Sequence, residues 1–398
     1  MKRVLIIGGG SGATFLANTL DRRWFETTVV SDSALHMFQP GLLYVAFKNA
    51  PAGITRAERR LLPRHVHFVQ QDVTHVNLRE HRVRTQAGME LTYDEVVLAT
   101  GVQTAAARIP GLEEVNAQFG DYHSTIEQAQ KVWRHLAEVR GGTIVIGQGA
   151  AICKCPPSPL EGALLAEEFL RERGLKSRTK LVYFTPYPRP YAAEGINDVV
   201  APILRERGIE VRTFFDLDRV DTANRTIHSI EGEQIPYDVA FIVPPFIGAP
   251  ITYEPAEVLD EDRLIITDKF SLRVKGVESA FAIGDGTNLP TSKAGVGAHL
   301  EAKVVARALA AKPARFDGRT HCPMDLAYGK GTFVIGSYAA PTVKYAPSRL
   351  NHWMKAAMAR IYWISLRGWL DPLFDVYFRL TAPEKLAARQ AHRLRPAA

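Results

Sequence analysis

The three cysteines are the residues of this 398-residue chain whose type points most directly to chemistry. Cys153 and Cys155 are separated by one residue, and Cys322 lies far along the sequence. Three cysteines are too few for a secreted disulfide framework, and a zinc site would need four ligands, which the surrounding sequence does not offer. A C-x-C spacing is also short for an active-site disulfide. Two interpretations remain: thiolate chemistry by some of these cysteines, or inert burial, a common fate of the residue.

A glycine-rich turn near the N-terminus is the second chemical signal. Gly8, Gly10 and Ala13 form a G-x-G-x-x-A pattern directly after an apolar run and before a helix-like segment. The first glycine permits a tight turn, the second lets the backbone approach a pyrophosphate, and the small third residue lets helix and strand pack closely. The free N–H groups of the helix N-terminus favour an anion there. The pattern therefore predicts a dinucleotide site, with a structural turn that binds nothing as the alternative.

The ribose contact is expected where the second apolar strand ends, at Ser31 and Asp32. An acid at this point usually binds the ribose hydroxyls of a dinucleotide. The register puts Ser31 nearer the strand end, so Asp32 is offset by one residue from the expected position.

Alternating strand-like and helix-like segments would position these groups. The pattern begins with KRVLIIGGG and restarts at Gly141 with GGTIVIGQG, followed by a helix-like segment from Leu160 to Arg173. Strand, helix and strand in this order predict parallel sheets with crossover helices. The length suits two or three domains, and a composition of 46% hydrophobic and 23% charged residues is typical of a folded protein. We predict an α/β fold with two Rossmann-like domains and a C-terminal amphipathic helical region.

The C-terminal region carries the whole excess of positive charge. The net charge is +7, and residues 344–398 contain ten Lys/Arg and three Asp/Glu, a surplus of seven. Apolar residues recur there at helical spacing in two stripes: Trp353, Met354, Ala357, Met358, Ile361 and Tyr362, then Trp369, Leu370, Leu373, Phe374, Tyr377 and Phe378. Lys355 and Arg360 lie beside the first stripe. Aromatic stripes with basic neighbours predict helices that lie on an anionic lipid surface, with packing on the protein or a dimer seam as the alternative. Nucleic-acid binding is not expected, because the aromatic and basic residues do not interleave.

Several longer segments resemble known flavoproteins. YDEVVLATG and ESAFAIGDGTN resemble the ATG segment and the C-terminal flavin motif of two-dinucleotide flavoproteins. Four further segments resemble sulfide:quinone oxidoreductases and the related flavocytochrome c sulfide dehydrogenases: HMFQPGLLYVAF, AICKCPPSPLEGALLAE, FAIGDGTNLPTSKAGVGAHLEAK and HCPMDLAYGKGTF. The resemblance extends from residue 1 to about residue 365.

The resemblance implies FAD as cofactor and assigns roles to individual residues. Cys155 falls on the first redox cysteine and Cys322 on the second, with Cys153 as a bystander. These two thiols would capture sulfide as a persulfide and pass electrons through FAD to a membrane quinone. The residues expected to contact FAD are Gly8, Gly10, Ala13, Ser31, Asp32, Pro40, Thr100, Gly101, Asp285 and Lys293. Tyr328 and Phe333, close to Cys322 in the sequence, are predicted to flank the quinone.

The implied domains are an FAD-binding domain over 1–110 and 236–311, a second Rossmann-like domain over 111–235, and a C-terminal region over 312–398. Two positions depart from the family pattern. Ser124, in HSTIEQA, stands where many members carry a third cysteine, so FAD should be held noncovalently. The second unit, GQGAAIC, lacks the third small residue and the downstream acid of a nicotinamide site, so NAD(P)H use is not expected.

The expected location is the membrane surface on the cytoplasmic side. The N-terminal apolar run Val4–Ile7 is too short for a signal peptide, and no segment has the roughly 18 apolar residues of a spanning helix. The predicted reaction is oxidation of sulfide to polysulfide or sulfur with reduction of a quinone, and a homo-oligomer is possible. Three alternatives stay open: an NADH:quinone oxidoreductase, a sulfide dehydrogenase that reduces a cytochrome subunit, and a non-catalytic flavin- or sulfur-binding scaffold. No metal site is predicted.

Overall fold

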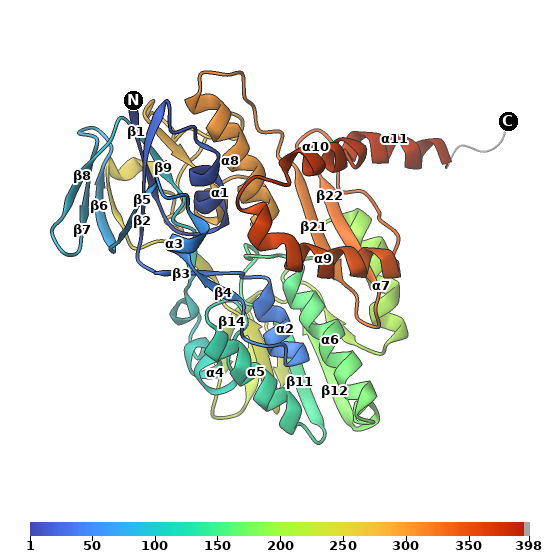
Figure 1. The fold of residues 1–398 in the computed structure, drawn as a ribbon. Coiled ribbons are helices and arrows are strands. Elements are labelled where there is room, and N and C mark those ends of the chain that lie inside the picture. Colours follow the sequence, from blue (N-terminus) through green and yellow to red (C-terminus); the bar gives the residue numbers. More distant parts are fainter. Residues whose placement is uncertain (394–398) are drawn as a thin grey trace.

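Two parallel sheets form the centres of the two halves of the molecule (Figure 1). The structure is a computed structural model that describes residues 1–393, with side chains to residue 389. The first sheet has the strand order β20-β9-β1-β2-β5, all parallel. Its strands are β1 (Lys2–Ile7), β2 (Phe25–Ser31), β5 (His67–Gln70), β9 (Glu95–Leu98) and β20 (Ala280–Ala282). Residues 4–7 of β1 are all buried, as expected for a parallel strand covered on both faces.

Helices α1 (Ser11–Thr19) and α8 (Gly295–Leu309) pack against each other beside this sheet. Three smaller groups of strands surround it: β6 (Val73–Asn77), β7 (Arg82–Thr85), β8 (Glu90–Thr92) and β19 (Thr252–Glu254) in one; β3 (Leu35–Met37) with β4 (Thr55–Ala57); and β10 (Val102–Thr104) with β18 (Phe246–Gly248). The short helix α3 (Glu58–Leu61) directly follows β4.

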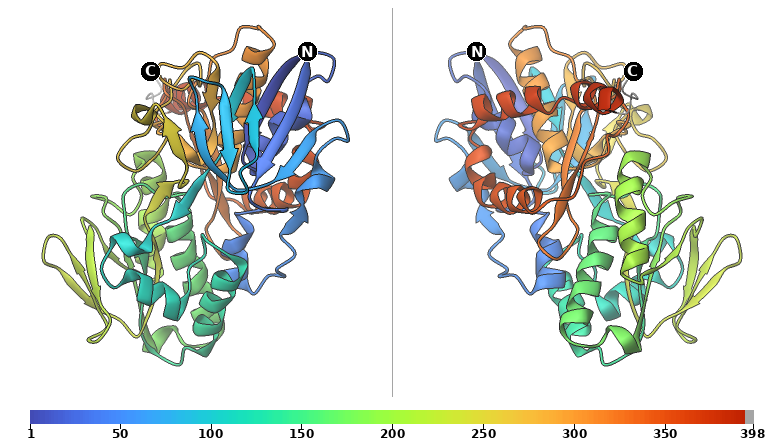
Figure 2. Two further views of the ribbon diagram at one scale, coloured as in Figure 1. Left: turned by 90° about the vertical axis from the view of Figure 1, so that its left-hand side faces the viewer. Right: turned by 90° about the vertical axis from the view of Figure 1, so that its right-hand side faces the viewer.

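The second sheet has the order β13-β12-β11-β17, again parallel. Its strands are β11 (Gly142–Gln148), β12 (Thr179–Phe184), β13 (Glu210–Arg212) and β17 (Val239–Val243). The helices of this half are α2 (Gly41–Lys48), α4 (Leu112–Phe119), α5 (Ile126–Glu138), α6 (Ser158–Glu172) and α7 (Glu194–Glu206). A small antiparallel sheet, β14 (Leu217–Asp221), β15 (Thr226–Ser229) and β16 (Gln234–Pro236), projects from its edge (Figure 2).

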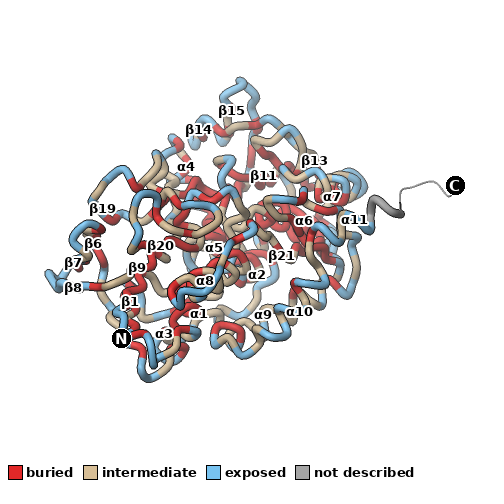
Figure 3. The backbone as a smooth tube through the Cα atoms, turned by 90° about the horizontal axis from the view of Figure 1, so that it is seen from above, coloured by how far each residue is buried: buried red, intermediate tan, exposed pale blue. Residues whose placement is uncertain are grey.

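These two parallel sheets confirm the predicted α/β fold with two Rossmann-like units. One strand differs from expectation. β17 falls within the stretch 236–311 that the sequence assigns to the first unit, but it pairs with β11 in the second sheet. The boundary at 236 therefore misplaces this strand. The chain returns to the first sheet only at β20. In Figure 3, buried stretches run through the interior of both units.

The C-terminal region begins with an antiparallel hairpin of β21 (Thr320–Asp325) and β22 (Gly331–Gly336). Helices α9 (Arg349–Ser365), α10 (Asp371–Leu380) and α11 (Pro383–Arg393) follow, and they lie along one side of the molecule (Figure 2, right). Ser348 caps α9, because its side chain accepts a hydrogen bond from the Asn351 N–H. No helix in the described part of the chain is long and apolar enough to cross a bilayer.

The two predicted apolar stripes do not each form one face. Trp369, two residues before α10, is 69% exposed, and Leu373 on α10 is 63% exposed. By contrast, Phe378 is buried and the Tyr377 hydroxyl bonds to the ring of His321 at 2.7 Å. On α9, Trp353 is 69% exposed, but Tyr362 turns inward. Both stripes therefore divide between a face packed on the protein and a face toward solvent. Of the basic residues, Arg395 and the side chain of Arg393 lie outside what the structure describes.

Candidate functional site

The glycine turn connects β1 to α1. Gly8 has φ of 120°, and a Cβ there would lie 2.2 Å from the Ala99 carbonyl oxygen, so only glycine fits this close approach. A Cβ on Gly10 would meet no atom within 4 Å, which leaves the turn open on that side. Ala13 is fully buried where α1 packs on the sheet. The turn therefore has the shape that a pyrophosphate needs, with the N-terminus of α1 directed at it.

Ser31 is the last residue of β2 and is buried beside the turn. A Cβ built on Gly9 would lie 2.7 Å from its Oγ. Asp32 follows the strand and is exposed, with its carboxylate 3.4 Å from the Ser31 hydroxyl. The structure thus brings both predicted ribose residues to the edge of the turn, with Ser31 the nearer.

The predicted flavin residues come from segments far apart in the sequence. A Cβ on Gly286 would lie 2.8 Å from the Gly101 carbonyl oxygen and 3.2 Å from the Thr100 hydroxyl, so these two turns abut. The Lys293 ammonium donates to the carbonyl oxygens of Asp285 (2.8 Å) and Thr287 (2.6 Å).

The Asp285 carboxyl group lies close to two positively charged side chains, Lys154 and Lys293. Burial raises the pKa of Asp285, while the charges of Lys154 and Lys293 act to lower it. The Lys154 ammonium also lies 3.3 Å from the Gln39 side-chain oxygen, and Pro40 follows at the start of α2. The flavin-flanking loop is thereby tied to the cysteine loop.

Cys155 lies in the loop between β11 and α6. Its φ of 54° places the backbone in the left-handed region, which is uncommon for a residue with a side chain. Its N–H donates to the Lys293 carbonyl oxygen at 2.8 Å, so this cysteine is fixed directly against the predicted flavin site. Helix α6 begins three residues later, at Ser158.

The structure brings Cys155 and Cys322 together, and both are free thiols. The Cys322 thiol donates a hydrogen bond to Cys155, which lowers the pKa of Cys155 although burial opposes it. The same bond, together with burial, raises the pKa of Cys322 well above its usual range. Cys155 is therefore the thiol that ionises first and the better leaving group in thiol exchange.

Cys153 has different surroundings, in the apolar core of the second unit. Its thiol donates to the Lys154 carbonyl oxygen at 3.1 Å, and burial raises its pKa well above the usual range. Such a thiol is unreactive. Its bystander role stays a prediction, and these surroundings favour it.

A buried charged cluster next to the cysteine pair was not predicted from the sequence. Lys355 on α9 donates to the Glu161 carboxylate on α6, and the Asp325 N–H donates to the same oxygen. The Tyr44 hydroxyl donates to the Asp325 carboxylate at 2.9 Å. Burial raises the pKa of Glu161, which Lys355 partly offsets, and the two charges act in opposite directions on the pKa of Cys155.

The expectation that Lys355 lies beside a lipid-facing stripe is wrong, because its side chain is buried against Glu161. The spacing of the sequence could have indicated this burial. Asn351 and Lys355 are four residues apart and are both buried on one face of α9.

Ser124 lies in a segment held against the cysteine loop. Its hydroxyl donates to the Asp121 carboxylate at 2.5 Å, and the His123 carbonyl oxygen accepts from Lys154 at 3.1 Å. The ring of His123 is 2.6 Å from the Ser158 hydroxyl at the start of α6. Burial, helped by Lys154, lowers the pKa of His123 to about 3, so this ring is neutral at ordinary pH. Sequence reasoning missed His123, because nothing around it marks it as buried.

The two residues predicted to flank a quinone do not lie beside the cysteine pair. Tyr328 is in the hairpin turn, where its hydroxyl donates to Glu167 and the Arg207 guanidinium lies over its ring. Phe333 neighbours Val334, which pairs with Cys322, so its side chain points to the opposite face of the hairpin. There it packs in a separate cluster with Ile335 and Val343. Neither contact places these side chains against Cys322, and their proximity to a quinone stays a prediction.

The corresponding turn of the second unit is obstructed. A Cβ on Gly147 would lie 2.4 Å from the ring of Phe184, the last residue of β12. The Tyr187 hydroxyl reaches across the turn and donates to the Ala151 carbonyl oxygen. β12 is followed by Thr185 and Pro186, so no acid stands where a ribose contact is expected. Among the described residues, no three His, Cys, Asp or Glu side chains lie close enough together to hold a metal ion.

Comparisons with known proteins show which family and which relatives this chain resembles. The family model for pyridine nucleotide-disulphide oxidoreductases matches residues 2–308. The mitochondrial sulfide:quinone oxidoreductase of Mus musculus is 27% identical, with 93% of this chain and 88% of that protein covered. An NADH dehydrogenase-like protein of Mycobacterium tuberculosis is 26% identical over 72% of each chain. The structure of the Aquifex aeolicus sulfide:quinone oxidoreductase has a TM-score of 0.80 at 20% identity, covering 92% of both chains.

Proteins of this family bind FAD, and the open glycine turn and the Thr100–Gly101 and Asp285 segments fit that cofactor. The predicted resemblance to sulfide:quinone oxidoreductases is confirmed. The chain belongs to the pyridine nucleotide-disulphide oxidoreductase family.

Proposed function

We propose that this protein oxidises sulfide and passes the electrons through FAD to a quinone. The observation that carries the proposal is the contact between Cys155 and Cys322 next to Lys293, with Cys155 the thiol of lower pKa. The similarity to sulfide:quinone oxidoreductases supports it. Neighbouring thiols with unequal pKa values are suited to an exchange in which one sulfur is attacked and the other leaves.

The unequal pKa values give the exchange a direction. In the oxidised pair, sulfide attacks the Cys322 sulfur, the Cys155–Cys322 bond breaks, and Cys155 leaves as the more stable thiolate. Cys322 then carries a persulfide. A second sulfide removes the outer sulfur of this persulfide as HS₂⁻. The two thiols re-form their bond and release two electrons and their protons. The glycine turn and the Thr100–Gly101 and Asp285 segments would hold FAD, which would supply the two-electron redox chemistry that links this pair of thiols to a quinone. In sum, two HS⁻ become HS₂⁻, one proton and two electrons.

The residues around the pair have separate tasks in this proposal. Lys293 holds the Cys155 backbone and the Asp285 turn in one place, so the thiolate faces the flavin site. Lys355 and Glu161 place a buried, compensated charge pair near the thiolate. Ser124 has no thiol with which to tether a cofactor, so FAD should be released intact when the protein is denatured.

We further propose that the protein sits on a membrane surface, where a quinone dissolves. Its C-terminal helices present exposed apolar side chains, among them Leu350, Trp353, Trp369 and Leu373. Exposed basic residues accompany them: Arg349, Arg360, Arg367 and Arg379. This combination suits the anionic lipid interface. We retain the three-part domain division as a proposal, with β17 moved to the second unit.

Variants of the three cysteines test the proposal. Cys155→Ser and Cys322→Ser should each abolish sulfide-driven reduction of decylubiquinone while FAD stays bound. Cys153→Ser is the matched control, because its thiol is buried in the core, and it should keep most of the activity. The measurement is anaerobic addition of sulfide, followed by flavin absorbance and then by quinone. Activity in Cys155→Ser, or its loss in Cys153→Ser, would contradict the assignment.

The second candidate is an NADH:quinone oxidoreductase, which the similarity to the mycobacterial NADH dehydrogenase-like protein favours. Against it stand Phe184 and Tyr187, which occupy the surroundings of the second turn. Added to the same preparation, sulfide should bleach the flavin within seconds and NADH should not. Rapid bleaching by NADH alone would favour this candidate.

A further inference from the structure

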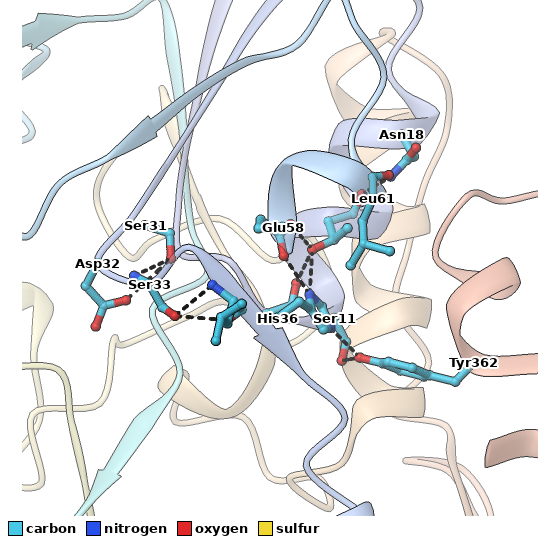
Figure 4. A network of polar contacts seen from close by, with 12 residues as sticks. Ser11, Asn18, Ser31, Asp32, Ser33, His36, Glu58, Leu61 and Tyr362 are labelled. Atoms are coloured by element: carbon cyan, nitrogen blue, oxygen red, sulfur yellow. Dashed lines mark hydrogen bonds and ion pairs between the residues drawn. The ribbon is translucent and has the colours of Figure 1, made fainter. Parts of the chain in front are cut away.

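A network of polar contacts joins the C-terminal helix α9 to the first turn of α1 (Figure 4). The Tyr362 hydroxyl on α9 is 2.7 Å from the Ser11 hydroxyl and 2.6 Å from Nε2 of His36. Ser11 is the first residue of α1 and directly follows Gly10 of the dinucleotide turn. A residue from the far end of the chain thus touches the segment that should receive the FAD pyrophosphate.

The network is anchored on a buried carboxylate. Nδ1 of His36 is 2.8 Å from one oxygen of Glu58, and the Thr14 hydroxyl donates to the other oxygen at 2.6 Å. The side chains of His36 and Glu58 are each 1% exposed. A carboxylate so far from water must keep all its hydrogen-bond partners, so the geometry of this group is firmly held.

The partners assign a direction to each hydrogen bond. With an ionised Glu58 carboxylate and a neutral His36 ring, His36 donates from Nδ1 and accepts at Nε2. Tyr362 therefore donates its one proton to His36, and its oxygen accepts the proton of Ser11. The Ser11 hydroxyl therefore points toward α9. The backbone N–H of Ser11 stays available at the N-terminus of α1.

The location gives this chain of contacts a consequence for the cofactor. A Cβ on Gly9 would lie 3.9 Å from the Glu58 carboxyl carbon and 2.7 Å from the Ser31 hydroxyl, so the network lies directly behind the dinucleotide turn. Four segments meet there: the start of α1, β3, α3 and α9. Of these four segments, only α9 lies outside the FAD-binding unit. Tyr362 is therefore the contact through which the C-terminal region restrains Ser11.

We propose that Tyr362 is a positioning residue for FAD: its hydroxyl holds Ser11 in the orientation that presents the N-terminus of α1 to the pyrophosphate. The C-terminal helical region therefore contributes to retention of the cofactor, beyond any contact with lipid. This inference concerns FAD binding and does not depend on the sulfide reaction.

Tyr362→Phe removes only the hydroxyl and leaves the ring. One hydrogen bond contributes roughly 0.5–1.5 kcal/mol, so FAD should dissociate about two- to tenfold faster. The rate is measured in the purified holoprotein by the fluorescence of released FAD after dilution. Tyr345→Phe is the control, because Tyr345 is also a partly buried tyrosine of the C-terminal region and packs on Phe333 by its ring. It should leave the rate unchanged.

A double-mutant cycle separates positioning from general packing. Ser11→Ala alone should speed dissociation, and Tyr362→Phe added to it should have less than its full effect, because both variants remove the Ser11–Tyr362 hydrogen bond. The melting temperature of Tyr362→Phe should fall further below that of the unchanged protein when FAD is bound than when FAD is absent. An unchanged dissociation rate, fully additive effects, or an equal loss of stability with and without FAD would each overturn the proposal. Should Tyr362→Phe fail to fold, the His36→Gln variant measures the same coupling from the other side of the hydroxyl.

Discussion

Two neighbouring thiols differ in acidity. The interaction between Cys155 and Cys322 lowers the pKa of Cys155 and raises that of Cys322, and burial acts to raise both. Cys155 also lies in a left-handed backbone conformation, held by the Lys293 carbonyl oxygen. Local strain at such a position is tolerated where the surroundings fix the residue strongly. The asymmetry of the pair is therefore built by the loop and strand, not by the cysteines alone.

Replacing Cys322 by alanine should raise the pKa of Cys155. The thiol that stabilises the Cys155 thiolate is then absent, while the burial that opposes ionisation remains. Hydrogen bonds to charged groups contribute roughly 1.5–3 kcal/mol, which corresponds to about one to two pKa units. Since the thiolate exists above the pKa, alkylation of Cys155 by iodoacetamide should begin at higher pH in Cys322→Ala. Both proteins carry Cys153→Ser, and mass spectrometry of the peptide that contains Cys155 follows that thiol separately from Cys322. If the midpoint pH for alkylation of Cys155 is unchanged or lower in Cys322→Ala, Cys322 does not have this role.

At the scale of elements, α9 is held on α6 by ionic contacts in the interior. Lys355 meets Glu161, and Asp325 of β21 contributes its N–H to the same carboxylate. A buried pair of this kind contributes little net stability when intact, but removal of one partner leaves an uncompensated charge. The pair therefore fixes where the C-terminal helix docks more than it adds to overall stability.

Lys355→Met should destabilise the protein by about 3–5 kcal/mol, because Glu161 loses its counter-charge in the interior. Urea denaturation followed by circular dichroism measures the change. Lys385→Met, at an exposed lysine of α11, is the control and should have little effect. Adding Glu161→Gln to Lys355→Met should recover part of the loss, since a neutral amide is less costly to bury. A loss of less than 1 kcal/mol in Lys355→Met would mean that the pair is solvated in solution.

The sequence predicts local features of these elements well and their orientation less well. The turn at Gly8, the strands and α6 depend on nearby residues, and the structure has them within a few positions. The α10 stripe contains Leu373 and Phe374 side by side, so spacing alone cannot tell the packed face from the exposed one. Nearness to Cys322 in the sequence could not place the Phe333 side chain, because neighbouring residues of a strand point to opposite faces. Lys355 was misjudged because its partner Glu161 is distant in the sequence.

At the scale of the whole molecule, α9 and α10 lie along one side (Figure 2, right), and both helices carry exposed apolar side chains. The inner faces of the same helices are occupied: Asp371 of α10 bonds to His299 and Lys303 of α8. A membrane bound at the outer face would therefore be connected, through packed helices, to the FAD-binding unit.

Charge introduced on the outer face should weaken membrane binding without unfolding the protein. We expect Trp369→Glu with Leu373→Glu to remove most binding to anionic liposomes in a sedimentation assay, while high salt alone removes only part. The control is Phe214→Glu with Ile230→Glu, two exposed apolar positions at the edge of the second unit. It should bind normally. Equal binding by both double variants would show that the outer face does not meet lipid, and a lowered melting temperature in the first would show that it is part of the core.

The pairing of β20 with β9 has a consequence for how the protein is made. The ribosome delivers β1, β2, β5 and β9 first, then the entire second unit, and only then the strand that completes the first sheet. During that interval the edge of β9 lacks its partner, and an unpaired buried edge invites association with other chains. The Asp285 turn emerges later still, and Tyr362 almost last. The nascent chain should therefore need protection by chaperones until β20 has been synthesised, and it should bind its cofactor only after the Asp285 turn and Tyr362 have emerged.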